Sequence, residues 1–294
     1  MQVWLFLMCD SLVVSGIGVK SQQNAASNSF IVADSSVKVR SLREVLMRSL
    51  QSTLKRIQIV ALNRAHAATL RGLGKVREHR HCPLCGWTGF QFSAGKPGPF
   101  FRFDARCPSC WSAERHRLAY ILLKDSLPAK IDKILHFAPE PEIQKWLQGR
   151  CTEYHTADLM DPRAMHKVDI QDMPFADNTY DLIWCSHVLE HVPDDRRALS
   201  EIRRILAPNG IAVIQVPLWG TKTIEGDLPT SERVRVYYQE DHLRRYGTDI
   251  LERLSVDGLS VSVRNVQELE LQLVLRCSLN DMASNDVFLL RKLA

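Results

Sequence analysis

The pattern of apolar and polar positions changes along the chain after Arg117. Beyond that residue, short apolar runs alternate with segments in which apolar residues recur every three or four positions. The short runs predict strands and the segments between them predict helices. Strands that alternate with helices form βαβ units, in which helices cover both faces of a parallel sheet. We therefore expect an α/β domain over residues 117–294.

The expected elements can be placed by residue range. Strands are expected at 133–138, 152–159, 165–170, 180–186, 210–216 and 260–266, with 286–293 closing the chain as an edge strand. Helices are expected at 118–127, 142–149, 194–208 and 241–258.

The amino-terminal part has a different pattern. Residues 1–37 predict a poorly ordered extension, because Asp10 interrupts their apolar run and no basic stretch precedes it, unlike a signal peptide or a membrane helix. Residues 38–78 predict a basic amphipathic helix with leucines at helical spacing. Eleven basic and two acidic residues lie between Lys38 and Arg80, so this segment is net +9 and the rest is net −4. The helix packs on its own domain, or contacts an anionic membrane or nucleic acid.

Four cysteines between these two parts have the spacing of a metal site. They form the pattern C-x2-C-x21-C-x2-C, in which each pair sits in a short turn: Cys82, Cys85, Cys107 and Cys110. Two such turns can supply four thiolates to one tetrahedral zinc ion, with a small hairpin between them. Four thiolates close the coordination sphere, so the zinc would be structural. We expect a zinc ribbon at 79–116 and, with little sign of disulfides, a reducing, cytoplasmic location.

The run VDIQDMPFADNTYDLIWCSHVLEHVPDDRRALSEIRRILAPNGIAVIQV resembles the class I S-adenosylmethionine-dependent methyltransferases of the type 11 group. The landmarks DMPF-x-DNTYD, VLEHVPD and RRILAPNG occur in the order and spacing of that family. The segments CPSCWSAERHRL and LHFAPEP resemble a narrower group that places a four-cysteine zinc ribbon before this domain. The resemblance implies a Rossmann-like, doubly wound, mostly parallel sheet of seven strands, and a methyl transfer that uses S-adenosylmethionine.

The loop after the first strand departs from the wider family, whose glycine-rich loop surrounds the methionine end of the cofactor. Here His136 replaces the acidic residue, Ala138 replaces a glycine and Glu140 stands at another glycine position. In the narrower group this sequence is the usual one, so the resemblance implies a variant cofactor loop. Glu140 would pair with the cofactor's ammonium group, or would simply cap the following helix.

Further cofactor contacts follow from the resemblance, position by position. Asp158, followed by Leu159, matches the acidic residue that accepts both ribose hydroxyls, a task that suits an acceptor-only carboxylate. Asp169 and the adjacent Ile170 match the positions beside adenine. Cys185 and Ser186 end the fourth strand and are expected near the methionine moiety. Both aspartates could instead be simple turn carboxylates.

Two histidines are the candidates for general acid–base catalysis. His187, Glu190 and His191 fit H-x-x-E-H, an inverted zinc-peptidase signature. A peptidase is not favoured, because the segment follows a strand and VLEHVPD is the usual sequence of the methyltransferase family at this position. An oxygen acceptor would need a general base, and His187 is the first candidate, with His242 second. Alternatively, His242 lies at a solvated helix end. Arg244 and Tyr246 could bind a polar or anionic acceptor.

The sequence leaves the methyl acceptor open. A small molecule or saccharide-type metabolite is favoured, with the ribbon shaping the acceptor pocket. RNA is an alternative that the basic segment 38–80 supports and the mildly acidic remainder weakens. A non-catalytic zinc-ribbon adaptor that has lost its cofactor is a third hypothesis, supported by the loop without glycines and opposed by Asp158 and Asp169.

Overall fold

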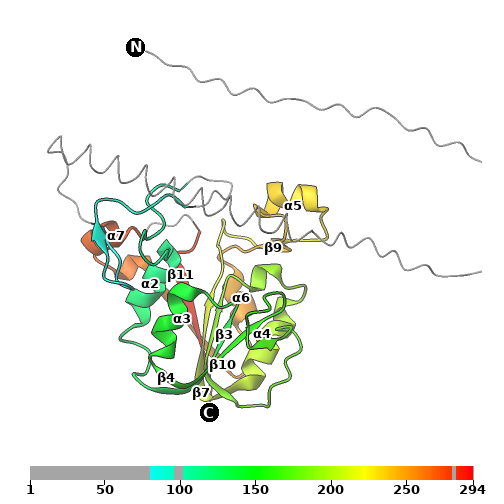
Figure 1. The fold of residues 1–294 in the computed structure, drawn as a ribbon. Coiled ribbons are helices and arrows are strands. Elements are labelled where there is room, and N and C mark those ends of the chain that lie inside the picture. The colour runs from blue at the N-terminus through cyan, green and yellow to red at the C-terminus, as the bar shows by residue number, and fades with distance from the viewer. Residues whose placement is uncertain (1–79, 96–101, 280–282, 294) are drawn as a thin grey trace, which may run out of the picture. The chain divides into compact units, whose positions relative to one another are not determined.

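The computed structural model describes residues 80–95, 102–279 and 283–293, which all belong to one compact unit (Figure 1). The predicted extension at 1–37 and the predicted basic helix at 38–78 lie outside the described residues. None of the described helices has both the length and the apolar character needed to cross a bilayer.

A seven-stranded sheet forms the centre of this unit, in the order β10-β11-β7-β6-β3-β4-β5. Its strands are β3 Ile131–Phe137, β4 Cys151–Asp158, β5 His166–Lys167, β6 Tyr180–Ser186, β7 Leu206–Gln215, β10 Leu259–Asn265 and β11 Asp286–Lys292. Pairing is parallel from β5 through β7, whereas β11 runs antiparallel to both of its neighbours. The predicted α/β fold with a doubly wound, mostly parallel sheet is confirmed.

Helices cover both faces of the sheet (Figure 1). The described helices are α2 Glu114–Leu123, α3 Pro141–Gln148, α4 Asp195–Ile205, α5 Thr230–Tyr237, α6 Ile250–Leu254 and α7 Leu271–Cys277. Side chains of α2, α3 and α7 share one apolar core with the sheet, and those of α4 and α6 share the other. The sheet is therefore buried on both faces, which explains its near-continuous apolar strands.

The chain reverses direction across the sheet between β3 and β6. From β3 it continues to β4 and β5 on one side, then returns to place β6 on the other side of β3. Ligands of open α/β sheets bind at the carboxyl ends of the strands beside such a switch point. The loops after β3, β4 and β6 are therefore the first place to look for a site.

Two sequence predictions about the carboxyl-terminal third were wrong. The last strand, β11, is not at an edge but lies between β7 and β10, where its apolar side chains Val287, Phe288 and Leu290 are buried. The helix expected at 241–258 is reduced to α6. The preceding residues form the short strand β9 Arg244–Arg245, which pairs with β8 Ile224–Glu225 because Arg244 is drawn into a buried network described below.

The cysteine-rich segment packs on the helices α2 and α7. Its first turn lies in a hairpin of β1 Arg80–His81 and β2 Thr88–Gly89. Arg117 of α2 is fully buried and donates five hydrogen bonds to carbonyl oxygens of the cysteine-rich segment and of the end of α7. Its guanidinium also lies 4.1 Å from the centre of the Phe92 ring. One side chain thus joins the two parts.

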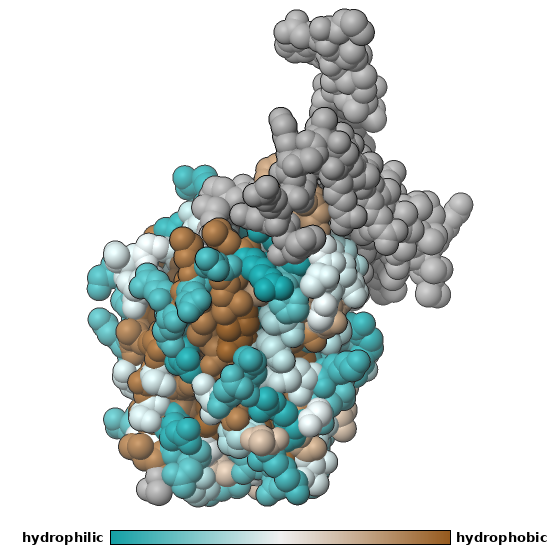
Figure 2. All heavy atoms as spheres, turned by 90° about the vertical axis from the view of Figure 1, so that its left-hand side faces the viewer, coloured by the Kyte–Doolittle hydropathy of each residue, from teal (hydrophilic) through white to brown (hydrophobic). Residues whose placement is uncertain are grey.

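Apolar surface is not evenly distributed over the molecule. Figure 2 shows apolar side chains gathered on the face that lies at the left of Figure 1, where α7 is found. In α7, Leu271 is 69% exposed and Leu275 is 43% exposed. Patches of this kind often mark contact surfaces.

Candidate functional site

The four cysteines predicted as metal ligands lie together, with their sulfur atoms within 4.8 Å of one another. The Sγ atoms of Cys82 and Cys110 are 3.6 Å apart, and those of Cys85 and Cys107 are 3.7 Å apart. A disulfide would need about 2.0 Å. A tetrahedron of zinc–sulfur bonds of about 2.3 Å has edges of about 3.8 Å. The spacing therefore fits one tetrahedral metal ion.

The loop after β3 is organised around Glu140. Its Oε1 atom accepts hydrogen bonds from Arg115, with Nη2 at 2.6 Å, and lies 2.7 Å from Nε2 of His116. Both partners belong to α2 and follow Cys110 by a few residues. Glu140 occupies the N-cap position of α3, but its side chain makes no capping hydrogen bond. Its second oxygen, Oε2, is buried and has no hydrogen-bond partner. That oxygen is available to a ligand.

The protonation of this cluster follows from its hydrogen bonds. Nδ1 of His116 accepts from the backbone N–H of Ala113, so Nε2 carries the proton and donates to Glu140. Burial lowers the pKa of His116 to about 4, which keeps the ring neutral at pH 7. Burial alone would raise the pKa of Glu140, but its contacts with His116 and Arg115 outweigh this and hold the pKa well below its ordinary value. Glu140 is therefore a buried carboxylate whose charge partner is Arg115.

His136 and Ala138 support this loop from within the protein. His136 is fully buried; its Nδ1 lies 2.7 Å from the hydroxyl of Tyr154, and its Nε2 accepts from the N–H of Glu140 at 3.4 Å. Burial lowers the pKa of His136 to about 4. Both ring nitrogens thus face protein groups. Ala138 has a φ of 45°, a left-handed conformation in which glycine is the favoured residue.

The two aspartates predicted to contact the cofactor both lie in hydrogen-bonded turns. Oδ1 of Asp158 accepts from the backbone N–H groups of Met160 and Asp161, at 2.6 and 2.7 Å, which leaves Oδ2 available. Oδ1 of Asp169 accepts from the N–H of Gln171, and both carboxylate oxygens contact the Gln171 side chain. Both aspartates therefore act as turn carboxylates, which is the alternative given in the sequence analysis. In Asp158 the turn uses only Oδ1, so Oδ2 can accept a further hydrogen bond.

Their neighbours differ in exposure. Leu159 is 49% exposed beside Asp158, whereas Ile170 is buried in the core beneath the turn that follows Asp169. Cys185 is also a core residue, and burial raises the pKa of its thiol above the ordinary value. It packs in the core and offers no thiolate at neutral pH.

Buried polar atoms without partners gather at the carboxyl ends of β6 and β7. Ser186 and Gln215 are neighbours in the sheet register, and both are nearly completely buried. The Oγ of Ser186 and both side-chain polar atoms of Gln215 lack hydrogen-bond partners. Because buried polar groups are usually hydrogen-bonded, such a cluster beside the switch point indicates a ligand site.

His187 follows β6 directly and lies among polar side chains. Its backbone has a φ of 56°, and its N–H donates to the carbonyl of Gln215. Nδ1 lies 3.1 Å from Oε1 of Glu190, while Nε2 lies 3.3 Å from the hydroxyl of Ser284. The ring therefore has a carboxylate on one side and a hydroxyl on the other, and it is 21% exposed. This geometry suits a base that receives a proton at Nε2.

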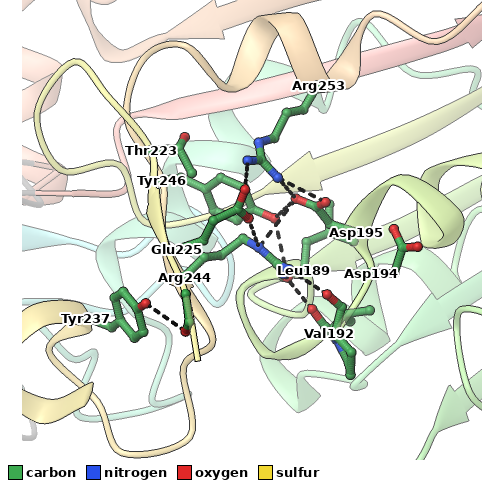
Figure 3. Close-up of polar contacts among 12 residues, drawn as sticks. Leu189, Val192, Asp194, Asp195, Thr223, Glu225, Tyr237, Arg244, Tyr246 and Arg253 are labelled. Atoms are coloured by element: carbon green, nitrogen blue, oxygen red, sulfur yellow. Dashed lines mark hydrogen bonds and ion pairs between the residues drawn. The ribbon is translucent and has the colours of Figure 1, made fainter. Parts of the chain in front are cut away.

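His242 is buried, at 3% exposure, and lies in the turn before β9, not at a solvated helix end. Burial lowers its pKa. Arg244 and Tyr246, considered as acceptor-binding residues, are also buried and face the protein (Figure 3). Arg244 donates to the carbonyl oxygens of Leu189, Val192 and Pro193.

Tyr246 extends the same network. Its hydroxyl donates to Asp195 at 2.7 Å, and Asp195 also pairs with Arg253, which in turn pairs with Glu225 of β8 (Figure 3). This network ties the segment that contains β8 and β9 to the start of α4. Arg244 and Tyr246 are therefore structural residues.

Comparison with known proteins bears on residues 137–214, from the end of β3 to the end of β7. This segment matches the family model described as "Methyltransferase domain". The similarity to this family covers 78 of the 294 residues of the chain. The match contains the loop of Glu140, both aspartates, Ser186 and His187. It supports a class I S-adenosylmethionine-dependent methyltransferase.

The curated relatives match over short segments. An "Uncharacterized 37.1 kDa protein in transposon TN4556" from Streptomyces fradiae is 38% identical over 90 residues, which are 31% of this chain and 24% of that protein. An "Uncharacterized methyltransferase" from Mycobacterium sp. (strain KMS) is 35% identical over 71 residues, or 20% of this chain and 28% of that protein. The matches span only 20–38% of the length of eight such relatives.

Among solved structures, an S-adenosylmethionine-dependent methyltransferase from Mesorhizobium loti is 14% identical with a TM-score of 0.45, covering 60% of this chain and 98% of that one. The N-methyltransferase NodS from Bradyrhizobium japonicum, in complex with S-adenosyl-L-homocysteine, is 18% identical with a TM-score of 0.40, covering 61% and 86%. These likenesses concern the fold alone.

Three residues of this region were not assigned a role from the sequence. Arg115 and His116 lie in the ERHRL segment, which the sequence offered only as a family landmark. Their link to Glu140 bridges 24 and 25 positions of the chain, so no local pattern reveals it. Glu190 was considered only within H-x-x-E-H, whereas the structure places it beside both His187 and the buried His242.

Proposed function

We propose that this protein transfers a methyl group from S-adenosylmethionine to a small-molecule or saccharide-type acceptor. The observation that carries the proposal is the pair of buried, unpartnered polar atoms at the carboxyl ends of β3 and β6, Oε2 of Glu140 and Oγ of Ser186, inside the segment that matches the methyltransferase family. When bound, S-adenosylmethionine supplies a methyl group on a positively charged sulfur, which an acceptor oxygen or nitrogen attacks in line.

The open acceptor atoms fit the polar groups of that cofactor. Oε2 of Glu140 would accept from the ammonium group, and Arg115 would pair with the carboxylate of the same methionine moiety. Oδ2 of Asp158 would accept from the ribose hydroxyls, since Oδ1 is already held by the turn. Asp169 and Ile170 would lie beside the adenine, and Ser186 near the sulfur end.

The four cysteines would hold one structural zinc ion, and its place in the chain gives it a function. The second cysteine pair ends at Cys110, and α2 begins four residues later with the segment that supplies Arg115 and His116. The hydroxyl of Ser112 lies 3.3 Å from the sulfur of Cys82 and 3.2 Å from that of Cys110. Zinc would therefore fix the start of α2, and through it the orientation of Glu140.

His187 is the group that we propose to receive the proton of an acceptor hydroxyl. Glu190 lies beside Nδ1, which holds the ring so that Nε2 presents its lone pair. Tyr246 and Arg244 would support His187 only indirectly. Both side chains donate to the carbonyl of Leu189 and so hold the strand β9 against the residues that follow His187. The chain's role is mainly to position the acceptor in line with the methyl group and to remove one proton.

A small acceptor is favoured over RNA by charge. The chain outside residues 38–80 is net −4, whereas proteins that bind RNA neutralise phosphates with clusters of Lys and Arg. The proposal is tested by incubating the full-length, zinc-loaded protein with methyl-labelled S-adenosylmethionine and a cell extract. We expect label in the small-molecule fraction, insensitive to ribonuclease and lost in Asp158→Asn. Label that appears only in ribonuclease-sensitive material would contradict the proposed acceptor class.

A further inference from the structure

Glu190, His191 and His242 form a second cluster with the composition of a metal site. One possible ligand atom of each residue lies within 4.8 Å of those of the other two. The His191 and His242 rings are 4.7 Å apart and nearly perpendicular, at 85°. Of these three residues, only Glu190 has a part in the methyl transfer proposed above, where its Oε1 lies beside Nδ1 of His187. Two imidazoles and one carboxylate are a ligand set for divalent first-row transition metals.

Burial makes the cluster unusual. Glu190 is 1% exposed, and neither of its oxygens has a hydrogen-bond partner, although Oε1 lies 3.1 Å from Nδ1 of His187. His242 is 3% exposed, and its Nε2 is buried without a partner. A buried carboxylate and a buried ring nitrogen are costly to leave unsatisfied. Both costs are removed by a cation bound between them.

The other nitrogen of each ring is oriented as in metal-bound histidines. Nδ1 of His242 lies 3.1 Å from the carbonyl oxygen of Tyr237, and Nδ1 of His191 lies 3.3 Å from the carbonyl oxygen of Asp241. A carbonyl only accepts, so each Nδ1 carries the proton and each Nε2 keeps its lone pair. Such contacts from the second ring nitrogen to a backbone carbonyl fix the tautomer of histidine ligands.

The backbone holds the two halves of the cluster together. The N–H of Leu243 donates to the carbonyl of Glu190 at 2.9 Å. Arg244 binds the carbonyls of Leu189 and Val192, which flank Glu190 and His191 (Figure 3). The cluster is thus built on the hydrogen-bonded network that joins β9 to residues 189–193, between β6 and α4. Preorganised ligands of this kind lower the cost of binding an ion.

We propose that Glu190, His191 and His242 bind one divalent first-row transition-metal ion. Metal–nitrogen bonds of about 2.0–2.1 Å in a tetrahedral site require ligand atoms about 3.3 Å apart. The ligand atoms would therefore move together slightly, through side-chain rotation. Three protein ligands leave at least one position open, as in catalytic sites and not in closed structural ones. An oxygen-bearing ligand or water would occupy it, next to His187 and the carboxyl end of β6.

Manganese distinguishes this site from the cysteine site, because Mn²⁺ favours nitrogen and oxygen ligands whereas four thiolates retain zinc. The full-length protein, loaded with one equivalent of Zn²⁺ for its four thiolates and freed of excess zinc, is titrated with Mn²⁺, and the free ion is followed by its electron paramagnetic resonance signal. We expect one bound Mn²⁺ per chain, displaced by added Zn²⁺ because nitrogen–oxygen sites bind zinc more tightly. This assay measures metal binding and needs no methyl transfer, so its result tests the metal site independently of the proposed function.

Two variants and one control assign the site. Glu190→Gln removes the charge with little change in shape, and His191→Gln alters a ring that is 34% exposed and so is tolerated by the fold. Each should weaken Mn²⁺ binding at least tenfold. The control is His166→Gln, which changes a histidine in a similar ring pair, with His155 at 5.2 Å, and should bind like the wild type. Absence of bound Mn²⁺ in folded protein, or equal binding in all variants, would overturn the proposal.

Discussion

Replacing Arg117 by methionine tests how firmly the cysteine-rich segment is joined to the sheet domain. The guanidinium is fully buried and serves four carbonyl oxygens, those of Ala105, Ser112, Cys277 and Ser278. Methionine has a similar length but no donor. Each carbonyl left unsatisfied costs about 1–3 kcal/mol, although relief from burying a charge offsets part of the sum. We expect the free energy of unfolding to fall by roughly 3–5 kcal/mol, close to other losses of one partner in a buried charged network.

The loss is measured by urea unfolding of the zinc-loaded protein, followed by tryptophan fluorescence. At 2–4 °C per kcal/mol for a domain of this size, the melting temperature should fall by roughly 10 °C. Arg196→Met is the matched control, because Arg196 is exposed on α4, and it should change stability by less than about 0.5 kcal/mol. A loss below about 1 kcal/mol in Arg117→Met, at unchanged urea dependence, would refute the buried network.

Three further predictions follow from the loop of Glu140. Ala138→Gly should raise the free energy of unfolding by about 0.5 kcal/mol, because a left-handed alanine costs more than the extra chain entropy of glycine; a loss of stability in urea unfolding would contradict it. His116 and His136 have pKa values of about 4 in the folded protein and near 6.5 when unfolded, so the unfolded chain binds more protons between these pH values. Stability should therefore be fully present above pH 6.5 and decline as the pH falls towards 4, and an unchanged urea midpoint over this range would argue against neutral buried rings. Removing zinc with a chelator should weaken S-adenosylmethionine binding as well as lower the melting temperature, and unchanged affinity in calorimetry would show that the cysteine site does not orient Glu140.

The sequence predicted the part of the fold that depends on local patterns. The strand β6 begins and ends where its apolar run does, and α3 and α4 follow their helical spacing closely. The cysteine cluster was also predictable, because its ligand spacing is local within each pair. These features need only neighbours along the chain.

Features that depend on distant partners were missed. The helical pattern of 241–258 gave the wrong prediction. Arg244 is buried and hydrogen-bonds to the carbonyl of Leu189, and its segment forms the short strand β9 instead of a helix. The position of β11 inside the sheet depends on pairing with β7 and β10, which no local pattern specifies. The contact of Arg115 with Glu140 and the meeting of Glu190 with His242 likewise join residues that lie tens of positions apart.

The central claim is that the loop without glycines binds S-adenosylmethionine, and calorimetric titration with that cofactor and with S-adenosylhomocysteine tests it most directly. Asp158→Asn keeps an oxygen for the turn but removes the second carboxylate acceptor. Asp161→Asn is the control, because the Asp161 carboxylate accepts from the backbone N–H and the exposed side chain of the nearby Arg163. We predict micromolar binding by the wild type and by Asp161→Asn, and binding at least tenfold weaker in Asp158→Asn. Absence of binding in folded, zinc-loaded protein would contradict the account.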